Sequence, residues 1–260
     1  MSSTRRGTGR RVLVSTLVAV LVAAAWAAWP AGARASVIGD ICIDVWDAGK
    51  AHHGQQKFTI PESLLCVKAG KWKWDADLGA VGLAVRDAEN HILATINSLS
   101  VSIEEDPAVS LTYSMTAGSS DILFNIASPL VAFGTILHPQ AFATAGITVT
   151  DNDSNGATAT GLFAGGKAYE ARFDGVAWAN LIGNVTAGTD NSNTASDRRP
   201  GAAREAVPVS VSTMQSEFKF TLSANDSAGV TSRFDVVPEP ATLALLGAGL
   251  GVMLFRRRGR

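Results

Sequence analysis

The sequence lacks most signatures of catalysis. Its four histidines show no His-Glu-x-x-His spacing, and its many serines include no Gly-x-Ser-x-Gly elbow. Cysteine is limited to Cys42 and Cys66, so a scaffold held together by many disulfides is excluded. No internal repeat is present, which excludes a solenoid or propeller. We therefore predict a non-enzymatic chain, long enough to bury one sizeable core.

Basic residues are also scarce once the two ends are set aside. Of the 22 lysines and arginines, nine are arginines near the ends, which leaves 13 basic residues in the body. All 23 acidic residues lie between Asp40 and Glu239. The body therefore carries a net charge of about −10, which repels nucleic acid and anionic lipid. We exclude nucleic acid as a partner.

What the body does contain is a series of short β-type segments. Residues with β-branched or aromatic side chains alternate with small polar ones, and Gly, Asn, Asp and Pro punctuate the chain every ~8–12 residues. This pattern predicts a mostly β body, an antiparallel β-sandwich of jelly-roll-like or Ig-like type. The clearest predicted strands are Ala94–Ile103, Val109–Thr116, Asp121–Ala127, Gly146–Thr150, Ala157–Phe163, Ala168–Phe173, Val207–Met214, Phe218–Ser223 and Val230–Val236.

Two segments of the body depart from this pattern. Ala80–Ala88 is the best candidate for a helix. The stretch 187–206 is rich in Thr, Asn, Ser and Asp and has almost no large apolar residue, which predicts a long exposed loop. A disordered boundary between two subdomains is the alternative for that stretch.

The N-terminus has the pattern of an export signal. Four arginines, Arg5, Arg6, Arg10 and Arg11, precede an apolar segment from Val12 to Trp29, and Ala33-Arg34-Ala35 offers a small-x-small cleavage site. We predict a signal peptide and signal helix at 1–35, general secretion machinery and signal peptidase as partners, and a mature chain from about Ser36. An uncleaved N-terminal anchor is the alternative.

The C-terminus combines a rigid triplet, an apolar run and a cationic end. Pro238 and Pro240 restrict the backbone around Glu239 and hold it on an extended strip. The apolar residues 241–255 predict a short transmembrane helix, below the ~20 residues of a usual span. A group of arginines follows and anchors this end in the cytoplasm. The anchoring residues are Arg256, Arg257, Arg258 and Arg260.

This C-terminal segment resembles a PEP-CTERM sorting signal, a motif also described as an ice-binding-protein C-terminal domain. The resemblance rests on Val237-Pro238-Glu239-Pro240-Ala241-Thr242-Leu243 and the arginines behind it, and covers only about residues 237–260. It implies an exported protein of a Gram-negative bacterium that makes exopolysaccharide. It also implies that an exosortase processes the chain near Pro238, Glu239 and Pro240. The ice-binding label is no evidence that the body binds ice.

Both cysteines lie beyond the predicted signal peptide. Because thiols oxidise outside the cytoplasm, we predict a disulfide between Cys42 and Cys66. Two unlinked buried thiols are the alternative.

The sequence contains one calcium-loop-like segment. Asp151, Asp153 and Asn155 alternate at the first, third and fifth places, and Gly156 occupies the sixth. Leu162 stands where an EF-hand needs a bidentate Glu, so an EF-hand is excluded. Calcium binding by these three residues and a hairpin turn without metal both remain open.

Two further patterns bear on sugars. Trp72 and Trp74 would share one face of a strand, with Lys71 and Lys73 on the other, so the indoles could stack on a glycan or pack in the core. Asp75-Ala76-Asp77 and Glu104-Glu105-Asp106 could supply paired carboxylates for glycoside cleavage, but both lie among turn residues, and acidic clusters in so negative a body are expected on solvated surfaces.

These expectations combine into three segments and one function. We predict a signal peptide at 1–35, a β-sandwich body at 36–237 and a sorting signal at 238–260. The chain would be an inner-membrane precursor that is released to the cell surface or extracellular matrix, where it has a structural, adhesive or exopolysaccharide-associated role. The alternative is a secreted carbohydrate-binding module or carbohydrate-active enzyme, with calcium as its one possible cofactor.

Overall fold

The computed structural model describes residues 36–38, 40–59, 66–68, 71–201 and 203–238. Within these ranges the chain forms two antiparallel sheets, and no described residue is helical. The prediction of a mostly β body with antiparallel sheets is therefore confirmed. The predicted signal helix at 1–35 and the transmembrane helix at 241–255 lie outside the described residues. The structure describes no helix long and apolar enough to cross a membrane.

The first sheet, sheet A, is built around the long strand β18. Its path is β1-β10-β18-β9-β2-β3; β12 and β13 also pair with β18, β14 pairs with β13, and β15 pairs with β12. The strands are β1 (Ser36–Ile38), β2 (Ile41–Asp47), β3 (His53–Phe58), β9 (Ile122–Ala127), β10 (Leu130–Ile136), β12 (Ala157–Gly161), β13 (Tyr169–Phe173), β14 (Val176–Leu181), β15 (Val185–Ala187) and β18 (Val211–Leu222).

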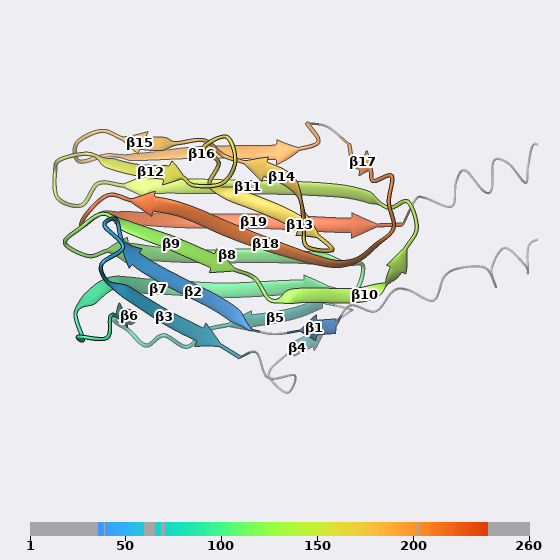
Figure 1. Ribbon diagram of the computed structural model, residues 1–260, viewed down its shortest axis with the longest axis horizontal. Coiled ribbons are helices and arrows are strands. Elements are labelled where there is room, and N and C mark those ends of the chain that lie inside the picture. Colours follow the sequence, from blue (N-terminus) through green and yellow to red (C-terminus); the bar gives the residue numbers. More distant parts are fainter. Residues whose placement is uncertain (1–35, 39, 60–65, 69–70, 202, 239–260) are drawn as a thin grey trace, which may run out of the picture. The chain divides into compact units, whose positions relative to one another are not determined.

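The second sheet, sheet B, has the path β16-β11-β19-β8-β7-β5-β4, with β17 paired to β11 and β6 paired to β7. The strands are β4 (Cys66–Lys68), β5 (Lys71–Asp75), β6 (Leu83–Arg86), β7 (Ile92–Glu104), β8 (Ala108–Ala117), β11 (Gln140–Thr150), β16 (Ser192–Arg199), β17 (Glu205–Ala206) and β19 (Ser227–Val237). In Figure 1 the long strands of both sheets lie roughly along the same axis, and their arrows point in alternating directions.

The chain changes sheet repeatedly. It passes from sheet B to sheet A between β8 and β9, returns between β10 and β11, and crosses again between β11 and β12 and between β18 and β19. Consecutive strands at these crossings therefore face one another across the core instead of pairing.

The core lies between the sheets and follows from the alternation of side chains along each strand. In β11 every second residue is buried, as the period of two in a strand requires. The ring of Tyr113 on sheet B meets Phe218 on sheet A edge to face, with centroids 5.7 Å apart. Trp178 of sheet A stacks on Phe234 of sheet B at 5.7 Å. Large aromatic contacts thus join the two layers.

The predicted helix at Ala80–Ala88 is wrong. Leu83–Arg86 form β6, which pairs antiparallel with β7. Gly82 has a φ of 75°, and a Cβ there would lie 2.7 Å from the carbonyl oxygen of Ile96. The glycine thus lets the chain approach β7 closely and turn into a strand.

The predicted loop at 187–206 is also wrong. It contains β16 at the edge of sheet B, which pairs with β11 over eight residues, and the short strand β17. An edge strand has only one neighbour, and the outward side of β16 carries hydroxyl residues. The segment therefore needs few large apolar side chains, which is why its composition indicated a loop.

Candidate binding surface

The outer surface of sheet B is rich in small hydroxyl residues. On the four adjacent strands β11, β19, β8 and β7, the residues facing the core are mainly apolar, and many of those facing outward are Ser, Thr or Gly. The edge strand β16 continues the outward Ser and Thr residues, although its inward side carries Asn193, Ala195, Asp197 and Arg199. We name this surface the hydroxyl face. Its members are Ser192, Thr194, Ser196, Thr144, Gly146, Thr148, Thr150, Ser227, Gly229, Thr231, Ser110, Thr112, Ser114, Thr116, Ser98 and Ser100.

The register of the strands aligns these residues in rows across the sheet. One row runs from Ser196 through Gly146, Thr231 and Thr112 to Ser100. Neighbouring strands are ~4.8 Å apart, so donor and acceptor oxygens recur at a regular spacing. Because the side chains are short, the face presents hydroxyls with little relief.

Several of the hydroxyls are bonded to one another between strands. The hydroxyl oxygens of Ser98 and Ser114 are 2.7 Å apart, and those of Thr148 and Thr194 are 2.8 Å apart. A hydroxyl has one donor and two acceptor positions, so each such pair keeps capacity for a further partner. The face is therefore ordered and can still accept or donate hydrogen bonds outward.

A charged cluster borders the hydroxyl face. Arg233 donates two hydrogen bonds to the Glu104 carboxylate, both of 2.9 Å, and the Lys71 ammonium lies 3.1 Å from the same group. The hydrogen bonds from Arg233, with the help of Lys71, lower the pKa of Glu104 from 4.5 to about 2 against the opposing effect of burial. Glu104 is therefore ionised and tied to its neighbours, and it is no proton donor near neutral pH.

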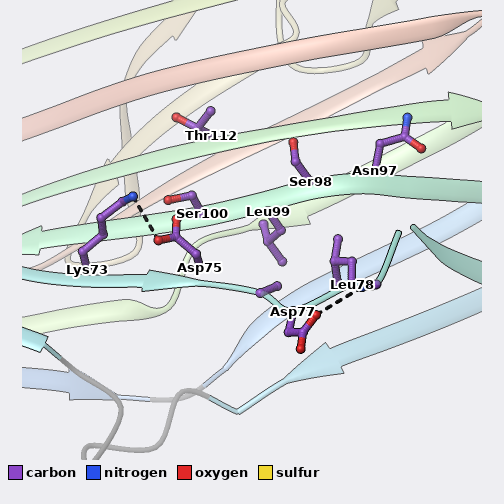
Figure 2. Close-up of a pocket in the computed structure, with 11 residues that line it drawn as sticks. Lys73, Asp75, Asp77, Leu78, Asn97, Ser98, Leu99, Ser100 and Thr112 are labelled. Atoms are coloured by element: carbon purple, nitrogen blue, oxygen red, sulfur yellow. Dashed lines mark hydrogen bonds and ion pairs between the residues drawn. The ribbon is translucent and has the colours of Figure 1, made fainter. Parts of the chain in front are cut away.

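An open groove of about 620 Å³ adjoins the hydroxyl face where β5 runs beside β7 (Figure 2). Lys73, Asp75, Ser100 and Thr112 line it, and Asp77 lies at its far end. The volume is in the range of small-molecule sites, but only about half of the lining surface is apolar. A hydrogen bond from Ser100 and the Lys73 ammonium at 2.9 Å lower the pKa of Asp75.

Trp72 and Trp74, the candidate glycan-stacking residues, lie on the opposite side of β5 from this groove. They occupy positions paired with the buried residues Ile103 and Val101, and both are half-buried. The Trp74 ring lies 5.8 Å from Phe58 of sheet A. This orientation favours core packing, and the strand instead presents Lys71, Lys73 and Asp75 outward.

The turn between β11 and β12 brings two of the three predicted calcium ligands together. Carboxylate oxygens of Asp151 and Asp153 lie within 4.8 Å of each other and of Asp226, which the sequence analysis missed. Asp226 comes from the β18–β19 turn, and nothing in the local sequence connects it to residue 151. Asn155 contributes its backbone N–H, which donates to Asp151 at 3.3 Å.

Backbone donors already surround the Asp151 carboxylate. It accepts N–H groups from Asp153 at 3.3 Å and from Asp190 at 2.6 Å. Burial raises the pKa of this carboxyl, but the backbone hydrogen bonds outweigh that effect and lower it overall. These contacts are those of a turn held by its own side chain, and calcium binding here stays a prediction.

The structure describes the remaining predicted site residues only in part. Cys42 is half-buried on the outer side of β2, because the core positions of that strand are Ile41, Ile43 and Val45. The side chain of Cys66 lies outside the described side chains, so the disulfide stays a prediction. Pro238 is exposed directly after β19. The other sorting-signal residues lie outside the described residues, namely Glu239, Pro240, Arg256, Arg257, Arg258 and Arg260.

Comparison with known proteins identifies the C-terminal segment. Residues 236–258 match the model of the PEP-CTERM protein-sorting motif, as the sequence analysis indicated. The motif supports an exported, envelope-targeted protein. No curated protein matches the chain.

Two solved viral structures are similar to parts of the chain at low TM-score. One is the enzymatically active domain of tailspike protein 4 of bacteriophage CBA120, with 12% identity, a TM-score of 0.24, and coverage of 50% of this chain and 18% of that one. The other is infectious bursal disease virus, Gx strain, with 9% identity, a TM-score of 0.25, and coverage of 82% and 59%. At these scores neither likeness carries an argument.

Proposed function

We propose that this chain, which carries the PEP-CTERM protein-sorting motif, is a non-enzymatic surface or matrix protein that binds exopolysaccharide through its hydroxyl face. In this proposal the precursor is held in the inner membrane by residues 241–255 and processed by an exosortase near Pro238-Glu239-Pro240. The observation that carries the binding role is the run of small hydroxyl and glycine positions across five adjacent strands.

Polysaccharides suit such a face chemically. A sugar chain offers hydroxyl donors and acceptors along its length, and each hydroxyl of the protein can both donate and accept. A surface with low relief allows a long polymer to lie across several strands, where many weak hydrogen bonds add up. Each hydrogen bond contributes a net free energy of only about 1 kcal/mol, so the affinity would depend on the number of hydrogen bonds formed.

The groove beside the face supplies the second candidate function, a carbohydrate-active enzyme. It places Asp75 and Asp77 along one lining, and a pair of carboxylates is what glycoside cleavage requires. A general acid needs a raised pKa, however, and the pKa of Asp75 is lowered by Ser100 and Lys73. This arrangement favours a sugar-contacting role for the groove over catalysis.

The test removes hydroxyls from the centre of the face. Thr112 and Thr231 are exposed and paired directly across β8 and β19. In the double variant Thr112→Val and Thr231→Val, we expect the full chain to bind exopolysaccharide isolated from the producing bacterium about tenfold more weakly in a co-sedimentation assay, or ~1.4 kcal/mol.

A matched control lies on the other sheet. Thr160 and Thr221 are likewise paired across two strands, β12 and β18 of sheet A. The double variant Thr160→Val and Thr221→Val loses the same number of hydroxyls and should bind as the wild type does. The proposal would be contradicted if both double variants bound exopolysaccharide equally weakly, or if the wild type did not bind it.

A further inference from the structure

Four side chains of metal-ligand type meet where two hairpins from different sheets end. His52 lies in the turn between β2 and β3 of sheet A, and Asp87, Glu89 and His91 lie in the turn between β6 and β7 of sheet B. One ligand atom from each of the four lies within 4.8 Å of the other three. The residues are separated by up to 39 positions in the sequence, so no local sequence motif predicts the cluster.

The distances within the cluster fit a tetrahedral metal ion. The Asp87 Oδ2 atom is 2.8 Å from His52 Nδ1 and 3.0 Å from His91 Nδ1, and Glu89 Oε2 is 3.7 Å and 3.6 Å from the same two nitrogens. Zinc bonds to nitrogen and oxygen are ~2.0–2.2 Å long, so the ligands of a tetrahedral zinc are separated by about 3.3 Å. The four measured distances bracket that value.

The backbone holds the key carboxylate in position. Asp87 Oδ1 accepts the N–H groups of Glu89 at 3.0 Å and His91 at 2.8 Å, which leaves Oδ2 directed at the two imidazoles. The Asp87 side chain is only 3% exposed. Burial raises its pKa, but the hydrogen bonds from His91 and Glu89 outweigh burial and lower it. The backbone thus fixes the direction of the Asp87 carboxylate towards both imidazoles.

The two hairpins are fixed beside each other by a glycine. A Cβ at Gly54 of β3 would lie 2.5 Å from the carbonyl oxygen of Arg86 and 2.9 Å from a methyl group of Val85. Only a residue without a side chain permits this approach of β3 to β6. On the other side of the cluster, the backbone N–H of His52 donates to Asp47 at 2.9 Å. Both turns are thus constrained before any ion arrives.

The charge and chemistry of the cluster select the kind of ion. Two carboxylates balance a dication, and the nearby Arg86 guanidinium is directed to the carbonyl of Asn90 at 2.8 Å. Imidazole nitrogens suit zinc, copper or nickel, whereas calcium and magnesium prefer oxygen alone. The sequence analysis found no metal-binding spacing among the histidines, because Asp87, Glu89 and His91 come from another hairpin than His52.

We propose that His52, Asp87, Glu89 and His91 form a binding site for a divalent transition metal, with Zn²⁺ the best match. Bound there, the ion would join the β2–β3 hairpin of sheet A to the β6–β7 hairpin of sheet B. The site is separate from the hydroxyl face and adds a structural metal to an exported protein.

The experiment uses the full chain purified in detergent without a polyhistidine tag. We expect calorimetric titration to show one Zn²⁺ bound per chain, and Co²⁺ to give the intense visible absorption of tetrahedral coordination. The double variant His52→Ala and His91→Ala should raise the dissociation constant at least tenfold, since the loss of outer-shell partners alone changes metal affinity by ~10–100-fold.

The control removes the same number of histidines elsewhere. His53 and His138 are exposed and lie outside the cluster, so the double variant His53→Ala and His138→Asn should bind Zn²⁺ as the wild type does. Zinc should raise the melting temperature of the wild type and of this control, but not of the cluster variant. Glu89→Gln is a second test, because this ligand is exposed and its replacement should leave the fold intact. It should also weaken Zn²⁺ binding.

Two results would overturn the proposal. One is a wild-type chain that binds no Zn²⁺, which would show that the cluster is a hydrogen-bonded surface group of two histidines and two carboxylates. The other is equal weakening in the two double variants, which would show that zinc binds to exposed histidines in general.

Discussion

At the scale of single residues, Glu104 makes the strongest charged contacts beside the hydroxyl face. Its pKa is lowered from 4.5 to about 2, so it stabilises the fold fully above pH 4.5 and progressively less as the pH falls towards 2. Glu104→Gln should lower the free energy of unfolding by about 1 kcal/mol near neutral pH, since solvent screens the half-buried pair. Urea unfolding at several pH values measures this loss.

The loss should shrink as the pH falls, because protonation of the wild-type Glu104 weakens the same contacts. The neighbouring Glu105 is exposed in the β7–β8 turn, and Glu105→Gln should leave the stability nearly unchanged. A Glu104→Gln loss that stayed constant down to pH 2 would assign the effect to packing instead of charge.

At the scale of elements, β19 sets a limit on processing. It lies between β11 and β8, its last pair is Val237 with Gln140, and the N–H of the buried Val236 donates to Pro107 at 2.8 Å. Cleavage upstream of Val237 would shorten a central strand. We therefore expect the mature protein to end at Val237 or later, as intact mass spectrometry of the protein from its native host would reveal.

Glu239→Ala should block that processing and leave a heavier, membrane-held precursor. Glu105→Ala, which replaces an exposed glutamate far along the sequence from the triplet, is the control and should mature normally. Normal maturation of Glu239→Ala, or a mature end before Val237, would contradict this account of the signal.

The strands also show how far the sequence could be interpreted. Alternation predicted β7, β8, β9, β13 and β19 to within a few residues, because each buries one side against the opposite sheet. The two predicted strands Val207–Met214 and Phe218–Ser223 overlap one strand, β18 (Val211–Leu222), and residues 207–210 before it are not in a strand. The edge strand β16 was missed because its inward positions, Asn193, Ala195, Asp197 and Arg199, show no apolar alternation. The alternation of apolar and polar residues indicates that one side of a strand is buried, so it does not reveal a strand that buries few apolar side chains.

The candidate sites depend on longer-range pairing than any local pattern can supply. The Ser and Thr residues of each strand were visible in the sequence, but their alignment into rows required the order β16-β11-β19-β8-β7. In the same way, His52 lies close to His91, and Asp151 lies close to Asp226, only because turns from different hairpins come together. Sequence analysis found the residue types, and the sheet topology determined which of them meet.

At the scale of the whole molecule, Asp226 connects two of the crossings between sheets. It is fully buried in the β18–β19 turn, where it accepts the N–H of Asn152 from the β11–β12 turn at 3.1 Å and a short hydrogen bond from the Ser223 hydroxyl. Asp226→Ala leaves these donors without their acceptor and should lower the free energy of unfolding by about 2–3 kcal/mol. Urea unfolding in a calcium chelator measures the change.

Repeating the unfolding in millimolar calcium separates the two explanations of this turn. If hydrogen bonds alone hold it, Asp226→Ala should lose the same stability with and without calcium. Asp153 is exposed, and Asp153→Asn should then cost little in either condition, because among the described residues its carboxylate accepts a hydrogen bond from Asn225 alone, at 3.1 Å. If calcium stabilised the wild type and neither variant, Asp151, Asp153 and Asp226 would instead be a calcium site that spans both sheets.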